Sequence, residues 1–212
     1  MSQESLAAAP TRRTQSERRD QSEKGLLTAA AELIAERGLG AATFDNIGQR
    51  AGYSRGLATQ KFGSKQGLIE ALIAHLHARA DAIFAERRVD EMPGLEAIVA
   101  YVDNYLRNLE TDGEVRAYFI MMAGAVADLS QVRAAFAASH QLVERRLEAM
   151  VLRGQAEGAI RPQIDADAAA LMIGSLLLGL SMQWLVDPQM ALAPIRETSI
   201  AILRLSFGQP AG

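Results

Sequence analysis

The sequence has no cysteine and only three histidines, which limits the chemistry available to the chain. Without cysteine in its 212 residues, the chain has no disulfide framework and no thiolate metal site. His75 and His77 are two residues apart and would point in different directions on a helix, so they do not suit a shared metal, and His140 is distant in sequence. We therefore expect no metal and no cofactor.

Signals for export are also missing. The first fifteen residues contain no apolar segment of the kind that forms a secretory signal. The absence of cysteine fits a reducing compartment. We therefore expect the protein to be cytoplasmic.

The net charge is small and the charged residues are unevenly distributed. The net charge is only −3, so the chain as a whole is not basic. Residues 1–75 carry ten Lys or Arg against eight Asp or Glu, whereas residues 76–212 carry twelve against seventeen. A DNA-facing head on an acidic body would have this asymmetry, because only the surface near phosphate needs positive charge.

One long stretch, Ala168 to Val186, contains no charged residue at all. Its length approaches that of a membrane-spanning helix. However, Ser175, Ser181 and Gln183 interrupt it, and no cluster of Lys or Arg flanks it to set an orientation. We therefore expect no membrane association. Instead, we expect this stretch to form a helix that is buried between the core of its own subunit and a partner subunit.

Signals for β-sheet are weak. Aromatic residues make up 5% of the chain while Ala and Leu dominate, a balance that favours packed helices. Apolar residues recur at helical spacing between capping residues, glycines and prolines. The predicted fold is all-α, with about nine helices: an N-terminal three-helix helix-turn-helix domain at residues 16–65 and a larger helical bundle at residues 66–212. Residues 1–15 are predicted to form a disordered N-terminal arm. The helices are expected at about residues 14–37, 43–51, 54–62, 64–84, 95–109, 115–127, 130–157, 165–187 and 189–207.

The segment from Thr43 to Phe62 is typical of two short helices separated by a tight turn that contains glycine. In such a unit the first helix braces the second, whose exposed side can enter the major groove of DNA. Ile47, Ala51, Leu57 and Phe62 are the residues expected to face inward. Gln60 could then pair with adenine and Arg55 with guanine.

Phosphate, which positions a protein without specifying sequence, is the expected partner of Thr43, Thr59, Lys61 and Lys65. The alternative is that these side chains are ordinary solvated helix surface. The candidates for DNA contact are Thr43, Ser54, Arg55, Thr59, Gln60, Lys61 and Lys65.

Residues 26–73 resemble the N-terminal DNA-binding domain of the TetR family of one-component repressors. The run from Ala42 to Lys65 carries the resemblance. Three positions depart from the pattern, with Gly48 in place of a usual Ala, Thr59 in place of Tyr and Lys61 where His is frequent. The remaining residues resemble the family only in helix count, helix lengths and composition. The matching positions are Thr43, Ile47, Ala51, Gly52, Ser54, Gly56, Phe62, Lys65 and Leu68.

The resemblance implies a homodimeric transcriptional repressor that a small apolar or amphipathic effector releases from a palindromic operator. Its partners would be double-stranded operator DNA, the effector and a second copy of the chain. The body, residues 66–212, would serve ligand binding and dimerisation. Candidate ligand-binding residues are Tyr101, Tyr105, Phe119, Met122 and Trp184, and candidate dimer-interface residues on the last two helices are Gly174, Leu178, Ile200 and Leu203.

Two other classes are weighed against this interpretation. A DNA-binding scaffold without an effector would have the same head and a filled body, and the sequence does not separate the two. A helical-bundle enzyme is disfavoured because the chain contains no nucleophile elbow, phosphate-binding loop or dinucleotide fingerprint. We expect no enzymatic activity.

Overall fold

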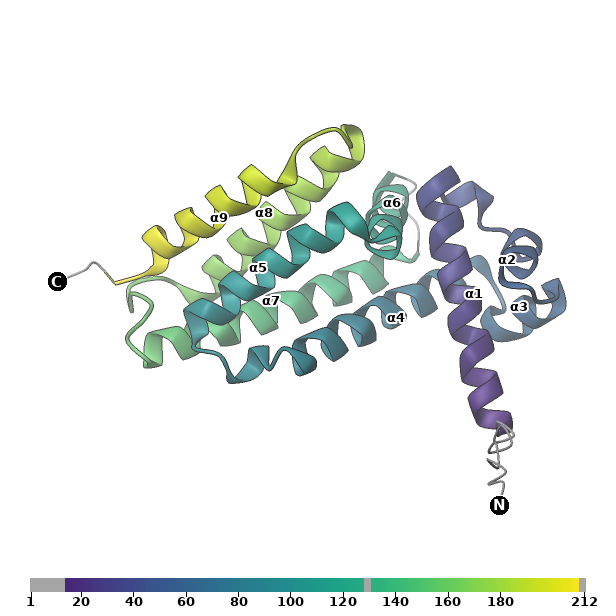
Figure 1. The fold of residues 1–212 in the computed structure, drawn as a ribbon, viewed down its shortest axis with the longest axis horizontal. Coiled ribbons are helices and arrows are strands. Elements are labelled where there is room, and N and C mark those ends of the chain that lie inside the picture. Colours follow the sequence, from purple (N-terminus) through teal and green to yellow (C-terminus); the bar gives the residue numbers. More distant parts are fainter. Residues whose placement is uncertain (1–13, 128–130, 210–212) are drawn as a thin grey trace, which may run out of the picture.

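The computed structural model describes residues 14–127 and 131–209, and within them it contains nine α-helices, as predicted (Figure 1). Two short 3₁₀ turns, Leu39–Ala41 and Val89–Glu91, join helices. The predicted disordered arm lies outside the described residues except for Thr14 and Gln15, where the first helix begins. The helices are α1 (Gln15–Arg37), α2 (Phe44–Ala51), α3 (Arg55–Phe62), α4 (Lys65–Glu86), α5 (Gly94–Thr111), α6 (Gly113–Ala127), α7 (Arg133–Ala156), α8 (Ala166–Val186) and α9 (Leu192–Phe207).

Five of the predicted helix starts coincide with side-chain caps. Thr14 and Glu17 form a capping box, in which the Thr14 hydroxyl accepts from the Glu17 amide and the Glu17 carboxylate accepts from the Thr14 amide. Gly52 ends α2 in the left-handed conformation, with φ of 73°, which glycine adopts without steric cost. The other predicted caps accept a hydrogen bond from the backbone amide three residues ahead: Thr43, Ser54, Ser64 and Asp165.

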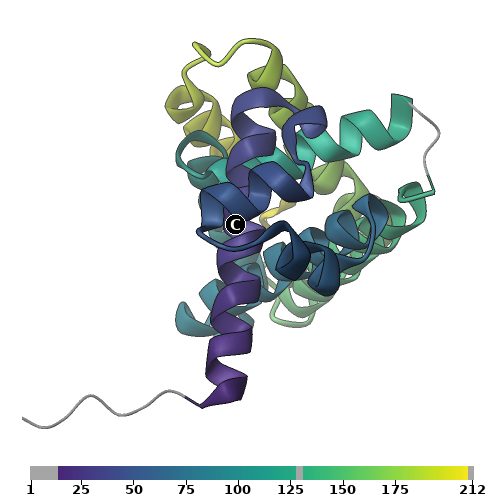
Figure 2. The same ribbon diagram turned by 90° about the vertical axis from the view of Figure 1, so that its right-hand side faces the viewer.

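The helices form a small head and a larger body, connected by the long helix α4 (Figure 1). α1, α2 and α3 make the head, and the first turns of α1 extend beyond the other helices (Figure 1 and Figure 2). α1 packs not only on α2 but also along α6 of the body. One hydrophobic core therefore runs from the head into the body through α6 and reaches Trp184 on α8.

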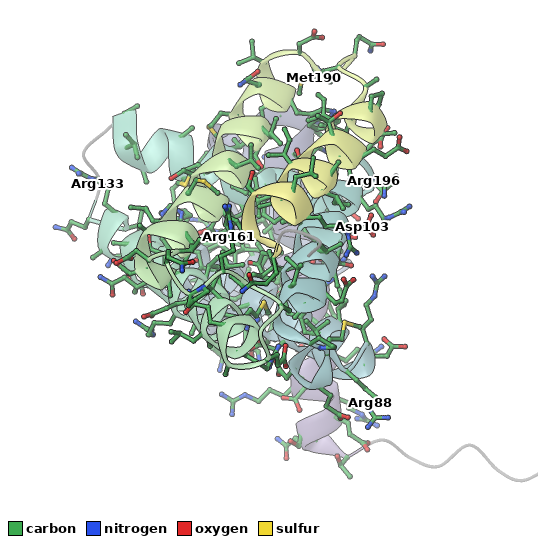
Figure 3. The ribbon with its side chains drawn as sticks, turned by 90° about the vertical axis from the view of Figure 1, so that its left-hand side faces the viewer. Arg88, Asp103, Arg133, Arg161, Met190 and Arg196 are labelled. Carbon is green, nitrogen blue, oxygen red and sulfur yellow. The ribbon has the colours of Figure 1, made fainter. Side chains whose placement is uncertain are left out.

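A second hydrophobic core fills the part of the body far from the head, between the end of α4 and helices α5, α7, α8 and α9. The start of α5 approaches α7 so closely that Gly94 lies against the backbone of Met150 and Gly154. On the other side α9 packs along α5, where Arg196 forms an ion pair with Asp103 (Figure 3). These contacts fix α5 between α7 and α9.

α8 is long and apolar enough to cross a membrane by length and composition alone. In this fold it is a body helix that packs along α7. Ala170, Ile173 and Ser181 are buried in the protomer, whereas Met172 and Val186 are exposed. One side of α8 is therefore left without a cover in the single chain.

Candidate DNA-binding head and effector cavity

α3 is held in place by buried contacts with the rest of the head. Ile47 and Phe62 are buried, as predicted, and the ring of Phe62 stacks on Phe44 with centroids 6.5 Å apart. Ala51 and Leu57 were also expected to face inward, and they are half-buried against the same core. The helix is therefore braced on one side, with its opposite side exposed.

The exposed side of α3 carries three of the predicted DNA-contact residues: Arg55, Thr59 and Gln60 are all exposed. Arg55 Nη1 lies 3.3 Å from Asp45 Oδ2, but both side chains are mostly in solvent, so this ion pair is easily exchanged for phosphate or a base edge. Lys65, at the start of α4, is exposed as well.

Two of the predicted contact residues serve as helix caps. The Thr43 hydroxyl accepts from the Asn46 amide and the Ser54 hydroxyl from the Leu57 amide, each at 3.2 Å. Both residues are exposed, so they place the positive ends of α2 and α3 at the surface.

Lys61 is placed differently from the expectation that it would be free for phosphate. Its Nζ lies 2.7 Å from Glu23 Oε2 and donates to the Arg19 carbonyl at 3.1 Å, and its side chain is 8% exposed. The reason is that the early turns of α1 run beside α3. A phosphate contact through Lys61 would require this ion pair to open.

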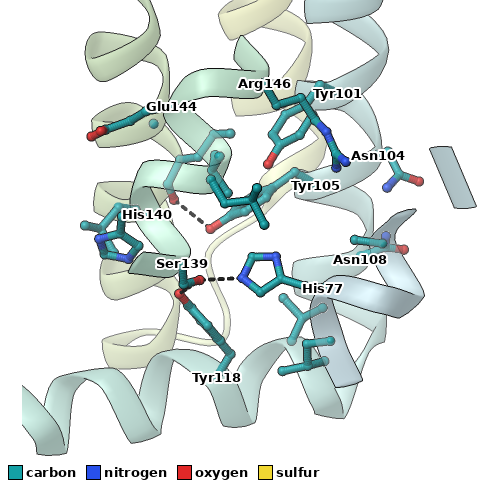
Figure 4. Close-up of a pocket in the computed structure, with 18 of the residues that line it drawn as sticks. His77, Tyr101, Asn104, Tyr105, Asn108, Tyr118, Ser139, His140, Glu144 and Arg146 are labelled. Carbon is teal, nitrogen blue, oxygen red and sulfur yellow. Dashed lines mark hydrogen bonds between the residues drawn. The ribbon is translucent and has the colours of Figure 1, made fainter. Parts of the chain in front are cut away.

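The body contains a cavity of about 250 Å³ between helices α4 to α8 (Figure 4). Tyr101, Tyr105 and Phe119 line it, in agreement with the predicted ligand-binding set. Met122 and Trp184 do not line it, because they are buried in the core that the body shares with the head. Three of the five predicted residues therefore lie at the cavity and two lie outside it.

The inner wall of the cavity has a short chain of hydrogen-bonding side chains that the sequence prediction missed. Ser139 Oγ lies 2.5 Å from His77 Nε2 and 2.7 Å from the Tyr118 hydroxyl (Figure 4). Next to them, the Tyr105 hydroxyl is 2.8 Å from Ser181 Oγ. These residues come from five different helices, so only the folded chain brings them together.

Burial keeps this wall uncharged. Desolvation lowers the pKa of His77 below its usual range, which favours the neutral imidazole at neutral pH. Burial likewise raises the pKa of Tyr105 and Tyr118, and it raises the pKa of Tyr101 to about 12. The wall can therefore exchange hydrogen bonds with a ligand without offering it a charge.

The outer part of the cavity reaches the protein surface between α7 and α8. Leu142 on α7 and Leu171 on α8 line the cavity and are exposed. Arg146 also lines it, with its guanidinium over the Phe84 ring at 5.1 Å and in an ion pair with Asp81. A ligand entering here would pass an apolar mouth first.

The predicted dimer-interface residues face their own protomer more than solvent. Leu203 is only 2% exposed and belongs to the second core. Ile200 packs against the same core, and Gly174 and Leu178 line the cavity. The exposed large apolar residues of these two helices are instead Leu171, Met172, Val186, Ile202 and Leu205.

The braced helix pair α2–α3 with its exposed polar surface, together with a separate ligand-sized cavity, is typical of helix-turn-helix transcription regulators that have a ligand-binding domain. Two family profiles agree: residues 26–72 match bacterial regulatory proteins of the tetR family, and residues 94–204 match the C-terminal domain of BetI-type transcriptional repressors. The chain belongs to the TetR family. It is a DNA-binding transcriptional repressor and not an enzyme.

Known proteins resemble the chain over most of its length. The transcriptional regulator TtgR of Pseudomonas putida is 26% identical over 194 residues, which cover 85% of this chain and 90% of TtgR. A TetR-family regulator from Rhodococcus has a TM-score of 0.77 at 21% identity, covering 89% of this chain and all of that one. SmeT is the repressor of the Stenotrophomonas maltophilia multidrug efflux pump SmeDEF. Its complex with triclosan has a TM-score of 0.74 at 22% identity, and the match covers 90% of this chain and 93% of SmeT. These two structures share the fold.

Proposed function

We propose that the protein acts in the cytoplasm as a homodimer that places two α3 helices in successive major grooves of a palindromic operator. The observation that carries this proposal is the exposed polar side of α3, with Arg55, Thr59 and Gln60 on a helix braced from behind. The half-sites would lie about 34 Å apart or somewhat more, since the body sets the spacing of the heads.

The exposed apolar residues of α8 and α9 support the homodimer. On α8, Met172, Gly179 and Val186 recur every seven residues, which places them on one side of the helix. On α9, Ile202 and Leu205 are three apart and both exposed. A second copy packed on this side would bury the apolar surface in a four-helix bundle.

The cavity supports a small, mainly apolar and uncharged effector with at least one hydrogen-bonding group. Tyr101 and Phe119 supply apolar surface, and the chain of His77, Ser139 and Tyr118 supplies donors and acceptors. We infer that occupation of the cavity lowers operator affinity. Triclosan, which SmeT binds in its structure, is a suitable first probe.

The proposal is tested by selecting bound duplexes from a random DNA pool. We expect a palindrome, and we expect Arg55→Ala to relax the base preference at one position in each half-site, costing about 1–3 kcal/mol there. Arg145→Ala, which removes an exposed cation on α7, is the charge-matched control and should leave the selected sequence unchanged. An identical sequence preference in the Arg55 variant would contradict the assigned role of α3.

A compound screen on the selected duplex separates the proposed function from the scaffold alternative. Release of the duplex by triclosan or by another uncharged apolar compound would support the effector role of the cavity. Retention of the duplex with every compound, together with no ligand-induced change in melting temperature, would favour a DNA-binding scaffold without an effector.

A further inference from the structure

The first turn of α6 carries a carboxylate that joins three helices. Glu114 Oε1 accepts a hydrogen bond from Thr28 Oγ1 of α1 at 2.9 Å. Its other oxygen, Oε2, accepts from Arg79 Nη1 of α4 at 2.6 Å and lies 3.3 Å from His75 Nε2, also on α4. The Glu114 side chain is only 13% exposed, so most of its surroundings are these partners. One residue of the body therefore contacts both the head and the connecting helix.

A second carboxylate fixes this arrangement. Asp112 Oδ1 accepts from the Glu114 backbone amide at 2.9 Å, which positions the start of α6. Asp112 also pairs with Arg79, so the guanidinium bridges two carboxylates. The hydrogen bond with Asp112 is the largest cause of the raised pKa of Arg79. The contacts between α4 and α6 at this point are thus mutually dependent.

The same two helices line the cavity immediately beyond these contacts. On α6, Val115 and Tyr118 follow Glu114 and line the cavity. On α4, His77 lies between the two residues that reach Glu114 and bonds into the cavity wall through Ser139. A molecule that separates α4 from α6 in the cavity must therefore strain the contacts of Glu114.

We propose that Glu114 is the positioning residue that couples the cavity to the DNA-binding head. Its carboxylate holds α1, α4 and α6 in the arrangement that binds operator, and cavity occupation opens that arrangement. If Arg79 moves away, the negative charge of the largely buried Glu114 carboxylate is no longer compensated. The contacts at Glu114 therefore form or break together. Because Thr28 bonds to the same carboxylate, α1 and the head respond with them. This inference rests on the proposed function.

Coupling between the head and the cavity is reciprocal, so DNA binding at the head must also change the helices that line the cavity. The coupling can therefore be measured without knowing the effector. The probe is a duplex selected from the random pool, and the measurement is hydrogen exchange of backbone amides at residues 113–122 with and without the duplex. In the wild type we expect duplex binding to slow exchange in this segment about fivefold or more. In Glu114→Gln we expect this slowing to be lost at saturating duplex and the affinity for the duplex to fall, because the arrangement that binds operator loses the carboxylate that holds it.

Two further variants sharpen the test. Thr28→Val removes only the bond from α1, at an exposed position where the side-chain shape is kept, and it should also abolish the response at α6. Glu110→Gln makes the same charge change on an exposed side chain whose carboxylate contacts no partner among the described residues, and it should respond like the wild type.

The outcomes are distinct. If the wild type retains no duplex, the proposed function fails and the coupling role fails with it. If the wild type binds the duplex without a response at residues 113–122, the coupling role alone is overturned. A full response in Glu114→Gln also overturns it; should that variant fail to fold, a full response in Thr28→Val does the same.

Discussion

At the scale of single residues, the positive charge that the head offers to DNA depends on which cations keep a partner inside the protein. Arg55 has only a loose, solvent-exposed ion pair with Asp45. Lys61 is instead held in a short contact with Glu23 and with a backbone carbonyl of α1. Although both are cations on the same eight-residue helix, only Arg55 is free to exchange its partner for phosphate.

We therefore expect Glu23→Gln to strengthen DNA binding by releasing Lys61. Operator affinity should rise several-fold in low salt, and the plot of log affinity against log salt should steepen by about 0.9 for the one added phosphate contact. Titration of a labelled duplex at several salt concentrations measures both quantities. The double variant Glu23→Gln/Lys61→Met should return to the wild-type slope; if it keeps the gain, the effect does not act through Lys61.

The buried His77 predicts how stability responds to acid. Its folded pKa is lowered by burial first and also by the nearby side chains of Arg146 and His140, against an opposing effect of Asp81. The unfolded chain therefore takes up a proton near pH 6.5 while the folded imidazole remains neutral, so the free energy of unfolding falls as pH is lowered through about 6.5. The stabilising contribution is present above that pH and is lost below it.

The variant His77→Gln keeps a hydrogen-bonding group beside Ser139 but removes this titration. Between pH 7.5 and 5.5 we expect its Tm to drop by about 2–4 °C less than that of the wild type. Thermal unfolding followed by circular dichroism at both pH values makes the comparison. An equal drop in the two proteins would show that His77 does not contribute to the acid response.

At the scale of helices, features encoded by neighbouring residues could be predicted from the sequence, and features that join distant residues could not. The caps at Thr43 and Ser54 were predicted correctly, because a cap is decided within four residues. The partner of Lys61 lies 38 residues away, so no local pattern shows it. Gly48 is a similar case: the sequence shows only that glycine stands where Ala is usual, whereas in the structure an added Cβ would lie 2.9 Å from the Tyr53 carbonyl oxygen in the turn before α3.

The packing of α5 on α7 gives a prediction at this scale. A Cβ on Gly94 would lie 2.2 Å from Gly154 N and 2.3 Å from Met150 O, both backbone atoms that cannot rotate away. Gly94→Ala should therefore push α5 from α7 and lower Tm by about 5 °C or more. Gly124→Ala is the control, because the nearest atom to its Cβ is a Leu39 methyl at 3.7 Å and helix propensity favours the change. Differential scanning calorimetry measures the Tm of both variants. An unchanged Tm for Gly94→Ala would contradict the close approach of α5 to α7.

At the scale of the whole molecule, three of the five predicted ligand-binding residues line the cavity, whereas the predicted interface residues of α8 and α9 face the protomer more than solvent. α8 is apolar on all sides, so its periodicity does not reveal which side meets the core, which lines the cavity and which stays exposed. Leu203 was expected at the interface and is buried, whereas Leu205, two residues later, is 81% exposed. The polar chain through His77 and Ser139 was missed because it joins helices more than sixty residues apart.

The exposure of Leu205 allows the proposed dimer to be tested without disturbing the protomer. A charge at this position costs little in a single chain, because the side chain is already in water, but it would be buried unpaired in a dimer packed through α8 and α9. We expect Leu205→Asp to sediment as a monomer at micromolar concentration. Because a monomer reaches only one half-site, operator affinity should fall by about 10²-fold or more.

The matched control is Leu152→Asp, which places the same charge at an apolar side chain 51% exposed on α7. It should stay dimeric and bind operator like the wild type, because α7 lies outside the proposed interface. If Leu205→Asp also remains dimeric with full operator affinity, α9 is not part of the interface. If Leu152→Asp alone dissociates, the heads are paired through α7, and their spacing would then be set by the helix that also lines the mouth of the cavity.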